Sequence, residues 1–404
     1  MSSPGREAAL HSQPELSADI IVVGAGAAGA TAAAVLARQG RRVLLLDERA
    51  TCPPVFKAEK VLRSELNLLR EWGLYEPLLP PSGYIVELLD AYDGRIVRRT
   101  PVEQIGLAYS DLVNTLRSNL PKSVETRISR VERIACDGGT AHVHLANGED
   151  LTARLLVLAC GICDPLLATL GLRRHIIHKE HGVVLGFNVI PVGSPTFSFD
   201  TVTYYPSDPA FQIDYLTLFK FRDVMRANLF TFLPANGSWI REFLEQSGPL
   251  LARAFPKLSR VTGEYRIAGK LEVGRADLYR IEGAMPDGVV IIGDAFQTTC
   301  PSTGLGIRKA FTDVAVLAQC VPDWFSSPGM GAEKISSFYH HPRKQAMDAY
   351  ALKNSYYHRH LACDLSLPWR IRRAMVHLKW KLPAPDFLLA AARRLARLRR
   401  SSGG

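Results

Sequence analysis

The segment from Asp19 to Asp47, DIIVVGAGAAGATAAAVLARQGRRVLLLD, constrains the fold more than any other part of the chain. Its first apolar run, Asp19–Val23, predicts a short buried strand. The alanine-rich stretch after it predicts a helix that ends at Gly40, and Arg42–Leu46 predicts a second strand. A strand, a helix and a strand in this order form a parallel βαβ unit, so the chain is expected to belong to the α/β class.

Three glycines at the first turn of this unit have separate physical tasks. Gly24 lets the chain turn sharply, Gly26 lets backbone approach a pyrophosphate, and Gly29 lets the helix pack closely on the strand. The helix N-terminus directs free N–H groups and the positive end of its dipole at the phosphates. An acidic residue 18 positions after the third glycine accepts hydrogen bonds from a ribose; Asp47 is preferred and Glu48 competes for this role. The predicted dinucleotide-binding residues here are Gly24, Gly26, Ala27, Ala28, Gly29, Asp47 and Glu48.

A second informative segment, GVVIIGDAFQTTCPSTGLGIRKAFTDV, spans Gly288–Val314. Val289–Ile292 predicts a buried strand that runs into a Gly-Asp pair. A proline turn and a GxG sequence follow, and the pattern then predicts a helix to about Cys320. With the Gly-rich turn, this segment resembles the class A FAD-dependent monooxygenases, the para-hydroxybenzoate hydroxylase family. The residues that match the family's spacing are Gly293, Asp294, Pro301, Gly304, Gly306 and Asp313.

The resemblance implies FAD as the dinucleotide. It implies that Asp294 binds the ribityl chain and that the backbone of Gly304–Ile307 faces the flavin N1 and C2 carbonyl. A helix N-terminus suits this position because reduced flavin carries negative charge near N1. The family's basic residue for the pyrophosphate corresponds best to Lys57, with Lys60 as the alternative. The cofactor-binding residues expected from this part are Lys57, Asp294, Pro301, Gly304, Leu305, Gly306 and Ile307.

Departures from the family pattern remove some expectations. A histidine that many members carry three residues after the Gly-Asp pair is Gln297 here, so no proton-transfer role is assigned to it. The family's middle Asp-Gly motif corresponds to RLLVLACG, in which Cys160 replaces the aspartate. This leaves open whether NADH or NADPH is the reductant. Cys160 and Cys163 are expected to pack as ordinary side chains, with a redox pair as the lesser alternative.

Length and patterning suggest two interleaved domains. The 404 residues exceed one compact domain, and from about Gly182 to Leu271 the pattern changes to alternating, aromatic-rich strands. We expect a Rossmann-type FAD-binding domain interleaved with a mainly antiparallel β substrate domain and followed by a helical, basic C-terminal extension. The expected boundaries are a disordered tail at 1–17, the FAD-binding domain at 18–77, 108–170 and 281–345, the substrate domain at 78–107 and 171–280, and the helical region at 346–404. Candidate inward-facing aromatic residues are Phe187, Tyr204, Tyr215, Phe219 and Phe230.

The charge is concentrated at the C-terminus. The chain carries a net charge of +10, of which residues 366–404 contribute +9. Phe387–Arg400 has apolar residues on one face and arginines around the other, which indicates an interfacial helix attracted to anionic lipid. A solvated helix docked on the domain is the alternative. Basic and aromatic residues are not interleaved on a β platform, which disfavours nucleic acid.

Other features bound the cellular context. The seven cysteines do not form a disulfide framework and fit a reducing compartment. No metal-ligand spacing, secretory signal or membrane-spanning run stands out. The expected location is the cytoplasm, with membrane association left open.

The resemblance implies an enzyme in which NADH or NADPH reduces FAD, O₂ adds to give a flavin hydroperoxide, and oxygen is transferred to an electron-rich carbon. We expect hydroxylation or epoxidation of a lipophilic aromatic or polycyclic metabolite, such as a quinolone, quinone or polyketide, in antibiotic or other secondary metabolism. No catalytic residue is predicted. The rivals are a flavin-dependent halogenase, for which Lys57 or Lys60 would supply the essential lysine, a prenyl reductase or cyclase, and a non-enzymatic escort or sensor protein.

Overall fold

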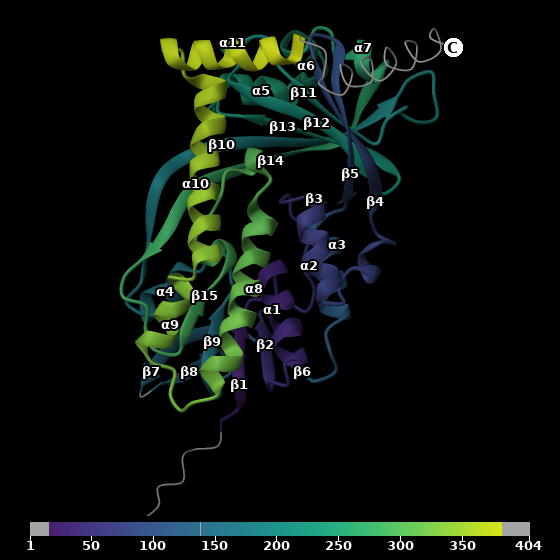
Figure 1. The fold of residues 1–404 in the computed structure, drawn as a ribbon. Coiled ribbons are helices and arrows are strands. Elements are labelled where there is room, and N and C mark those ends of the chain that lie inside the picture. Colours follow the sequence, from purple (N-terminus) through teal and green to yellow (C-terminus); the bar gives the residue numbers. More distant parts are fainter. Residues whose placement is uncertain (1–15, 138, 382–404) are drawn as a thin grey trace, which may run out of the picture.

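The computed structural model describes residues 16–137 and 139–381. They form two sheets stacked end to end and linked by long strands and helices (Figure 1). The N-terminal tail up to residue 15 and the predicted basic helix Phe387–Arg400 lie outside the described residues. The α/β class, with a Rossmann-type unit beside a mainly antiparallel sheet, is confirmed.

The first sheet contains the glycine-rich βαβ unit. Its order is β6-β2-β1-β9-β8-β7, and β15 also pairs with β9. The central pairs β1–β2, β1–β9, β2–β6 and β9–β15 are parallel, whereas β7, β8 and the start of β9 form an antiparallel meander. The strands are β1 (Ala18–Val23), β2 (Val43–Asp47), β6 (Val124–Ile128), β7 (Val131–Asp137), β8 (Thr140–Leu145), β9 (Asp150–Leu158) and β15 (Val289–Ile291).

Both faces of this sheet are covered, which explains why its central strands are continuously apolar. Ile20 and Val22 of β1 belong to a core shared with helices α1 and α8. The alternate residues Ile21 and Val23 belong to a second core, shared with β7, β8 and α4. The covering helices are α1 (Ala27–Arg38), α2 (Arg63–Glu71), α3 (Tyr109–Ser118), α4 (Asp164–Thr169), α8 (Gly306–Phe325) and α9 (Ala332–Tyr339).

The second sheet has eight strands in the order β14-β10-β13-β12-β11-β4-β5-β3. All neighbours are antiparallel except β11 and β4. The strands are β3 (Lys60–Leu62), β4 (Gly83–Tyr92), β5 (Arg95–Gly106), β10 (Arg173–Pro191), β11 (Thr201–Tyr205), β12 (Ile213–Phe221), β13 (Val224–Thr231) and β14 (Tyr265–Glu282). An Asp-Gly pair between two alternating strands predicts a hairpin turn, and Asp93-Gly94 forms the turn between β4 and β5.

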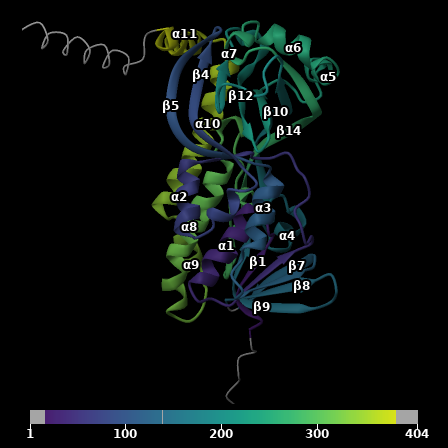
Figure 2. The same cartoon turned by 90° about the vertical axis from the view of Figure 1, so that its right-hand side faces the viewer.

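The two faces of the second sheet have different environments. Leu216, Leu218 and Leu229 point into a core closed by helices that the sequence patterning did not identify. These are α5 (Ser238–Glu245), α6 (Ser247–Ala254) and the short α7 (Ser259–Thr262). Figure 2 shows α5 and α6 at the end of the molecule away from the first sheet. The alternate residues point the other way, into a large cavity described below.

Two further helices complete the described chain. The long α10 (Pro342–Cys363) runs alongside α8 from the first sheet to the second, and α11 (Leu367–Lys381) lies across its upper end (Figure 1). The buried Arg373 of α11 donates hydrogen bonds to the backbone carbonyls of His360, Leu361 and Asp364, at the C-terminus of α10. The described start of the predicted C-terminal helical region is therefore helical and docked. The remaining described elements are the 3₁₀ turns η1 (Glu76–Leu78), η2 (Pro209–Phe211), η3 (Gly293–Ala295) and η4 (Pro301–Thr303).

Candidate FAD and substrate site

One cavity of about 1400 Å³ lies between the two sheets. This volume exceeds the roughly 300–1000 Å³ of an ordinary small-molecule pocket, which suits a dinucleotide together with a second ligand. Of the predicted cofactor residues, those that line it are Gly24, Gly26, Ala27, Ala28, Asp47, Glu48, Lys57, Asp294, Pro301, Gly304, Gly306 and Ile307. Gly29 and Leu305 are not among the residues that line the cavity.

The glycine-rich turn leaves no room for side chains. Gly24 has φ +95°, and a Cβ there would lie 2.6 Å from the Cα of Cys160. A Cβ at Gly29 would lie 1.8 Å from the Gly24 carbonyl oxygen, so α1 packs directly on the end of β1. Within the described part of the chain, no side chain of the N-cap residue bonds to the N-terminus of α1, although Ala27 N–H donates to the Tyr109 hydroxyl at 3.3 Å. The geometry required for a pyrophosphate at a helix N-terminus is therefore present.

Asp47 lies at the end of β2 and is held from several sides. Its carboxylate accepts hydrogen bonds from the backbone N–H of Ala25 at 2.7 Å and of Arg49 at 2.9 Å. Arg117 of α3 completes the arrangement with a 2.9 Å ion pair to the same carboxylate and hydrogen bonds to the Ala25 and Arg49 carbonyls. Sequence reasoning missed Arg117, because it lies 70 residues from Asp47 in a helix that shows only an amphipathic pattern.

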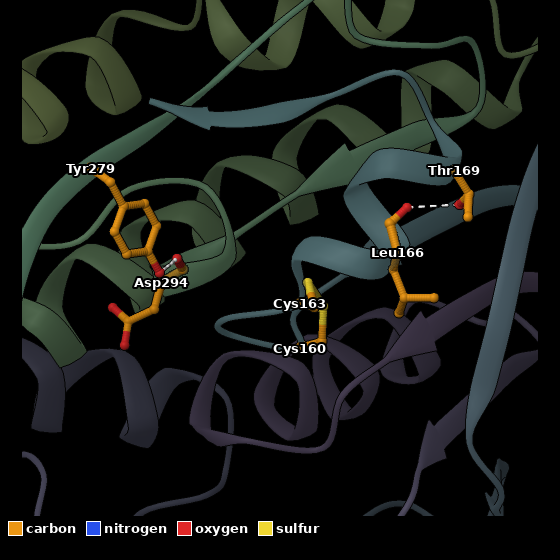
Figure 3. Close-up of a disulfide and its surroundings, with 6 residues drawn as sticks. All are labelled: Cys160, Cys163, Leu166, Thr169, Tyr279 and Asp294. Atoms are coloured by element: carbon orange, nitrogen blue, oxygen red, sulfur yellow. Dashed lines mark hydrogen bonds between the residues drawn. A yellow bond between two sulfur atoms is a disulfide. The ribbon is translucent and has the colours of Figure 1, made fainter. Parts of the chain in front are cut away.

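At the other end of the cofactor motif, Asp294 follows β15. Its carboxylate lies 3.6 Å from the Lys57 ammonium, and its backbone carbonyl accepts a 2.7 Å hydrogen bond from Tyr279 (Figure 3). Burial disfavours the charged form of Lys57, but Asp294, with smaller contributions from Tyr109 and Cys52, more than offsets this and raises the pKa of the lysine. Lys57 and Asp294 thus form an ion pair on the cavity wall, each side chain about half exposed.

The Gly304–Gly306 loop connects η4 to α8. Gly304 has φ +63°, and no atom of residues 16–137 or 139–381 lies within 4 Å of the position a Cβ would take, so this backbone is open to the cavity. Leu305 precedes α8 without a side-chain cap, so helix N–H groups remain available there. Tyr215 of β12 fixes the loop by donating a 2.6 Å hydrogen bond to the Ser302 carbonyl.

Buried charges support the Gly-Asp pair from behind. Asp313 of α8 accepts a 2.8 Å hydrogen bond from Gly293 N–H. The same carboxylate pairs with Lys309 at 3.1 Å and with Lys344 at 2.9 Å, all three side chains being almost fully buried. This connects the end of β15 to α8 and α10. Gln297 is buried nearby and donates to the Asp348 carbonyl, outside the cavity lining.

Cys160 and Cys163 are joined in a disulfide, which corrects the expectation that they pack as separate side chains. The disulfide closes the loop between β9 and α4, and both cysteines line the cavity. Figure 3 shows it across from Tyr279 and Asp294. The loop after β9 contacts the turn after β1 at Gly24. This contact places the disulfide beside the glycine-rich turn.

The second sheet supplies the opposite wall of the cavity. Of the five aromatic residues considered, Tyr215 and Phe230 line it, with ring centroids 4.7 Å apart. Phe187 and Tyr204 instead belong to the core on the other face of the sheet. Phe219 is fully buried beneath Lys60, whose ammonium lies 5.0 Å from the ring centroid.

Comparison with known proteins agrees with this geometry. A family model described as FAD binding domain matches residues 17–83, and one described as squalene epoxidase matches 276–376. Squalene monooxygenase of Mus musculus is 24% identical, covering 86% of this chain and 63% of its own length. Kynurenine 3-monooxygenase of Salinispora tropica is 28% identical, covering 75% and 72%. The crystal structure of p-nitrophenol 4-monooxygenase from Pseudomonas putida superposes with a TM-score of 0.67 at 17% identity, covering 88% and 91%.

The chain has the fold of the class A FAD-dependent monooxygenases, and the FAD binding domain model matches the segment that carries the glycine-rich turn, which indicates FAD as the cofactor. It spans 61% and 63% of the lengths of two curated relatives that it matches. The residues fit the cofactor: uncapped helix N-termini and glycine backbone meet the cavity at both ends of the motif, and carboxylates follow β2 and β15.

Proposed function

We propose that the protein is an FAD-dependent, NAD(P)H-consuming monooxygenase that hydroxylates or epoxidises a lipophilic aromatic or polycyclic metabolite, in secondary metabolism. One observation carries the proposal: a single cavity joins the predicted flavin-facing backbone at Gly304 to an aromatic wall of the second sheet. A substrate on that wall would lie against the ring of the cofactor. The matching family models and relatives support the same class of activity.

Bound FAD would supply the activation of dioxygen. The protein would bind and orient the substrate and keep water out of the cavity. We assign the ribose to Asp47, the pyrophosphate to the N-terminus of α1 and Lys57, and the ribityl chain to Asp294. The backbone N–H groups at the start of α8 would stabilise negative charge on the reduced ring. Tyr215 and Phe230 would contact the flat face of the substrate.

The test is isotopic. FAD-loaded protein is mixed with NADH or NADPH and ¹⁸O₂ over a panel of lipophilic phenols, quinolones and quinones, and product masses are measured. We expect one ¹⁸O atom per product and one NAD(P)H consumed. The proposal would be contradicted if NADH and NADPH failed to reduce the bound FAD in the presence of every member of the panel.

The rivals give different masses in the same assay. A halogenase is favoured by one observation, a lysine on the substrate side of the cavity, Lys60. It would require chloride or bromide and add a halogen. A prenyl reductase would add hydrogen without ¹⁸O, a cyclase would leave the mass unchanged, and an escort or sensor protein would give no product.

Peripheral membrane association belongs to the same proposal. Leu367, Ile371, Met375 and Leu378 form a stripe along α11, each more than half exposed. The other side of the helix is docked, where His377 contacts the Tyr92 hydroxyl at 3.1 Å. Exposed Arg370 and Arg372 lie beside the stripe, a combination that suits an anionic bilayer surface. None of the described helices is long and apolar enough to cross a bilayer.

Changing Ile371 and Met375 to serine is expected to weaken binding to phosphatidylserine-containing vesicles about tenfold, because two exposed apolar side chains leave the interface. Co-sedimentation of the full chain measures it. The control, Ile128→Ser, removes an equally exposed side chain from β6 and should bind like the wild type. Wild-type protein that stays in the supernatant, or a double variant that binds equally well, would refute membrane docking through this stripe.

A further inference from the structure

The disulfide between Cys160 and Cys163 lies in the wall of the cavity that we assign to FAD (Figure 3). The two cysteines are three positions apart, which is the spacing of dithiol pairs that exchange with other thiols. Both residues are partly exposed, and Ile162 between them is 70% exposed. A reductant in solution can therefore reach this disulfide.

The other cysteines of the chain are poorly suited to thiol exchange. Those that are not in the disulfide are Cys52, Cys136, Cys300, Cys320 and Cys363. Burial raises the pKa of each of these thiols, to about 11 for Cys136, Cys320 and Cys363 and to about 12 for Cys300. The thiolate is the reactive form, so these side chains react slowly near neutral pH. Thiol exchange is therefore expected at Cys160 and Cys163.

The start of the disulfide loop contacts the glycine-rich turn. Ala159 N–H donates a 2.8 Å hydrogen bond to the Val23 carbonyl, directly before that turn. A Cβ at Gly24 would lie 2.6 Å from the Cα of Cys160 and 2.7 Å from its backbone nitrogen. The position of Cys160 therefore affects the backbone to which we assign the pyrophosphate.

The end of the same loop is connected to Asp294. Asp164 follows Cys163 and forms an ion pair with Arg174. The Arg174 guanidinium lies 4.8 Å from the centroid of the Tyr279 ring, and the Tyr279 hydroxyl donates a 2.7 Å hydrogen bond to the Asp294 carbonyl. The disulfide loop thus contacts the first cofactor segment directly and the second through Arg174 and Tyr279.

The loop has room to move while its neighbours stay in place. Helix α4 is anchored by the buried Leu167 and by Thr169, whose hydroxyl accepts a 3.3 Å hydrogen bond from Ile134 N–H of β7. Gly161 has φ +66°, and no atom of the described residues lies within 4 Å of the position that a Cβ would take. Opening the disulfide would therefore free residues 160–163 without displacing β9 or α4.

We propose that Cys160 and Cys163 form a reversible redox switch that a dithiol reductant opens and that sets the affinity for FAD. One thiolate of the reductant attacks a sulfur of the pair, and the S–S bond between Cys160 and Cys163 breaks to give a mixed disulfide. The second thiol of the reductant then displaces the protein sulfur. Two electrons and two protons pass to the protein, and the reductant leaves as a disulfide. The reverse exchange, with an oxidised dithiol, closes the switch.

In the oxidised state the cross-link holds the loop against the Gly24 turn. In the reduced state the loop gains conformational freedom, which FAD binding has to remove again. The switch depends on the assignment of FAD to this cavity and not on the oxygenation reaction.

The test titrates the apoprotein with FAD before and after treatment with dithiothreitol, a small dithiol, and measures the dissociation constant by equilibrium dialysis. We expect the reduced wild type to bind FAD about tenfold more weakly, because the freed loop must be ordered on binding. Alkylation with iodoacetamide, followed by peptide mass measurement, should label Cys160 and Cys163 in the reduced protein only.

Two variants separate the switch from other effects of the reagent. Cys163→Ser cannot form the disulfide and should bind FAD like the reduced wild type, with or without dithiothreitol, which excludes an action of the reagent on the flavin. Cys136→Ser removes a cysteine of β7 outside the cavity lining and should respond to dithiothreitol as the wild type does. The comparison of oxidised and reduced wild type needs no substitution, so it holds even where a variant fails to fold.

Equal affinity of the oxidised and reduced wild type for FAD, or labelling of Cys160 and Cys163 before reduction, overturns the switch. Apoprotein that binds FAD in neither state contradicts the cofactor assignment together with the switch. Because NAD(P)H is absent and no turnover is measured, failure of the monooxygenase assay is a separate result.

Discussion

Replacing Asp313 by alanine is expected to lower the free energy of unfolding by about 3–5 kcal/mol, the usual cost of removing one partner from a buried ion pair. The variant leaves Lys309 and Lys344, both almost fully buried, with only the Asp348 carboxylate between them. It also leaves Gly293 N–H without its acceptor. Urea unfolding of the FAD-loaded protein at fixed FAD concentration measures the loss.

The same carboxylate predicts a pH dependence. Burial disfavours its ionisation, but Lys309 and Lys344 more than offset burial and hold the pKa of Asp313 below its ordinary value of 3.8. A depressed pKa in the folded state stabilises the fold above the unfolded value, and this contribution is lost as the pH falls through the folded value. The difference in stability between wild type and variant should therefore be full at neutral pH and should shrink below about pH 4.

Asp323→Ala is the matched control, because it removes an exposed aspartate from the same helix. It should change the free energy of unfolding by less than about 0.5 kcal/mol. A loss of stability in Asp313→Ala no greater than in this control would show that the lysines find other partners and that the network does not support the Gly293-Asp294 end of β15.

The second large effect is expected at Gly29. An alanine there would place its Cβ 1.8 Å from the Gly24 carbonyl oxygen, so α1 would have to move away from β1. The helix N-terminus would then leave the position at which we assign the pyrophosphate. We expect the affinity for FAD to fall about tenfold to 100-fold, the equivalent of typical overpacking strain. Equilibrium dialysis of the apoprotein against FAD measures this.

Gly248→Ala separates the steric effect from a general effect of replacing glycine. Gly248 lies in α6, has no atom within 4 Å of the position that a Cβ would take, and keeps an ordinary backbone conformation. This variant should bind FAD as the wild type does. An unchanged affinity in Gly29→Ala would mean that the turn has room that the structure does not show, and would contradict the assigned position of the pyrophosphate.

Local patterns predicted the fold well where physical requirements are local. The glycine spacing, the apolar strands and the Asp93-Gly94 turn each depend on neighbours within a few residues. The helices α5 and α6 were missed because they interrupt a region whose strands alternate strongly. The apolar residues of α5 and α6 do not indicate in the sequence which face of the sheet these helices cover.

The site was predicted in part. Backbone positions such as Gly24 and Gly304 follow from sequence because a glycine motif defines them. Partners such as Arg117 for Asp47 depend on helix α3 returning over the turn, which no spacing reveals. The roles predicted for the cofactor-binding residues stay predictions, because they depend on contacts with the cofactor. The predicted domain boundaries also stay predictions.

The two-sided second sheet has a consequence for how the shape of the cavity can change. Along β12 and β13 the cavity residues Tyr215, Thr217, Asn228 and Phe230 alternate with the core residues Leu216, Leu218 and Leu229. A side chain on one face can therefore be replaced without altering packing on the other. Inherited variation at alternate positions can reshape the cavity while the scaffold keeps its stability, so related proteins can come to differ in the shape of the cavity by single substitutions.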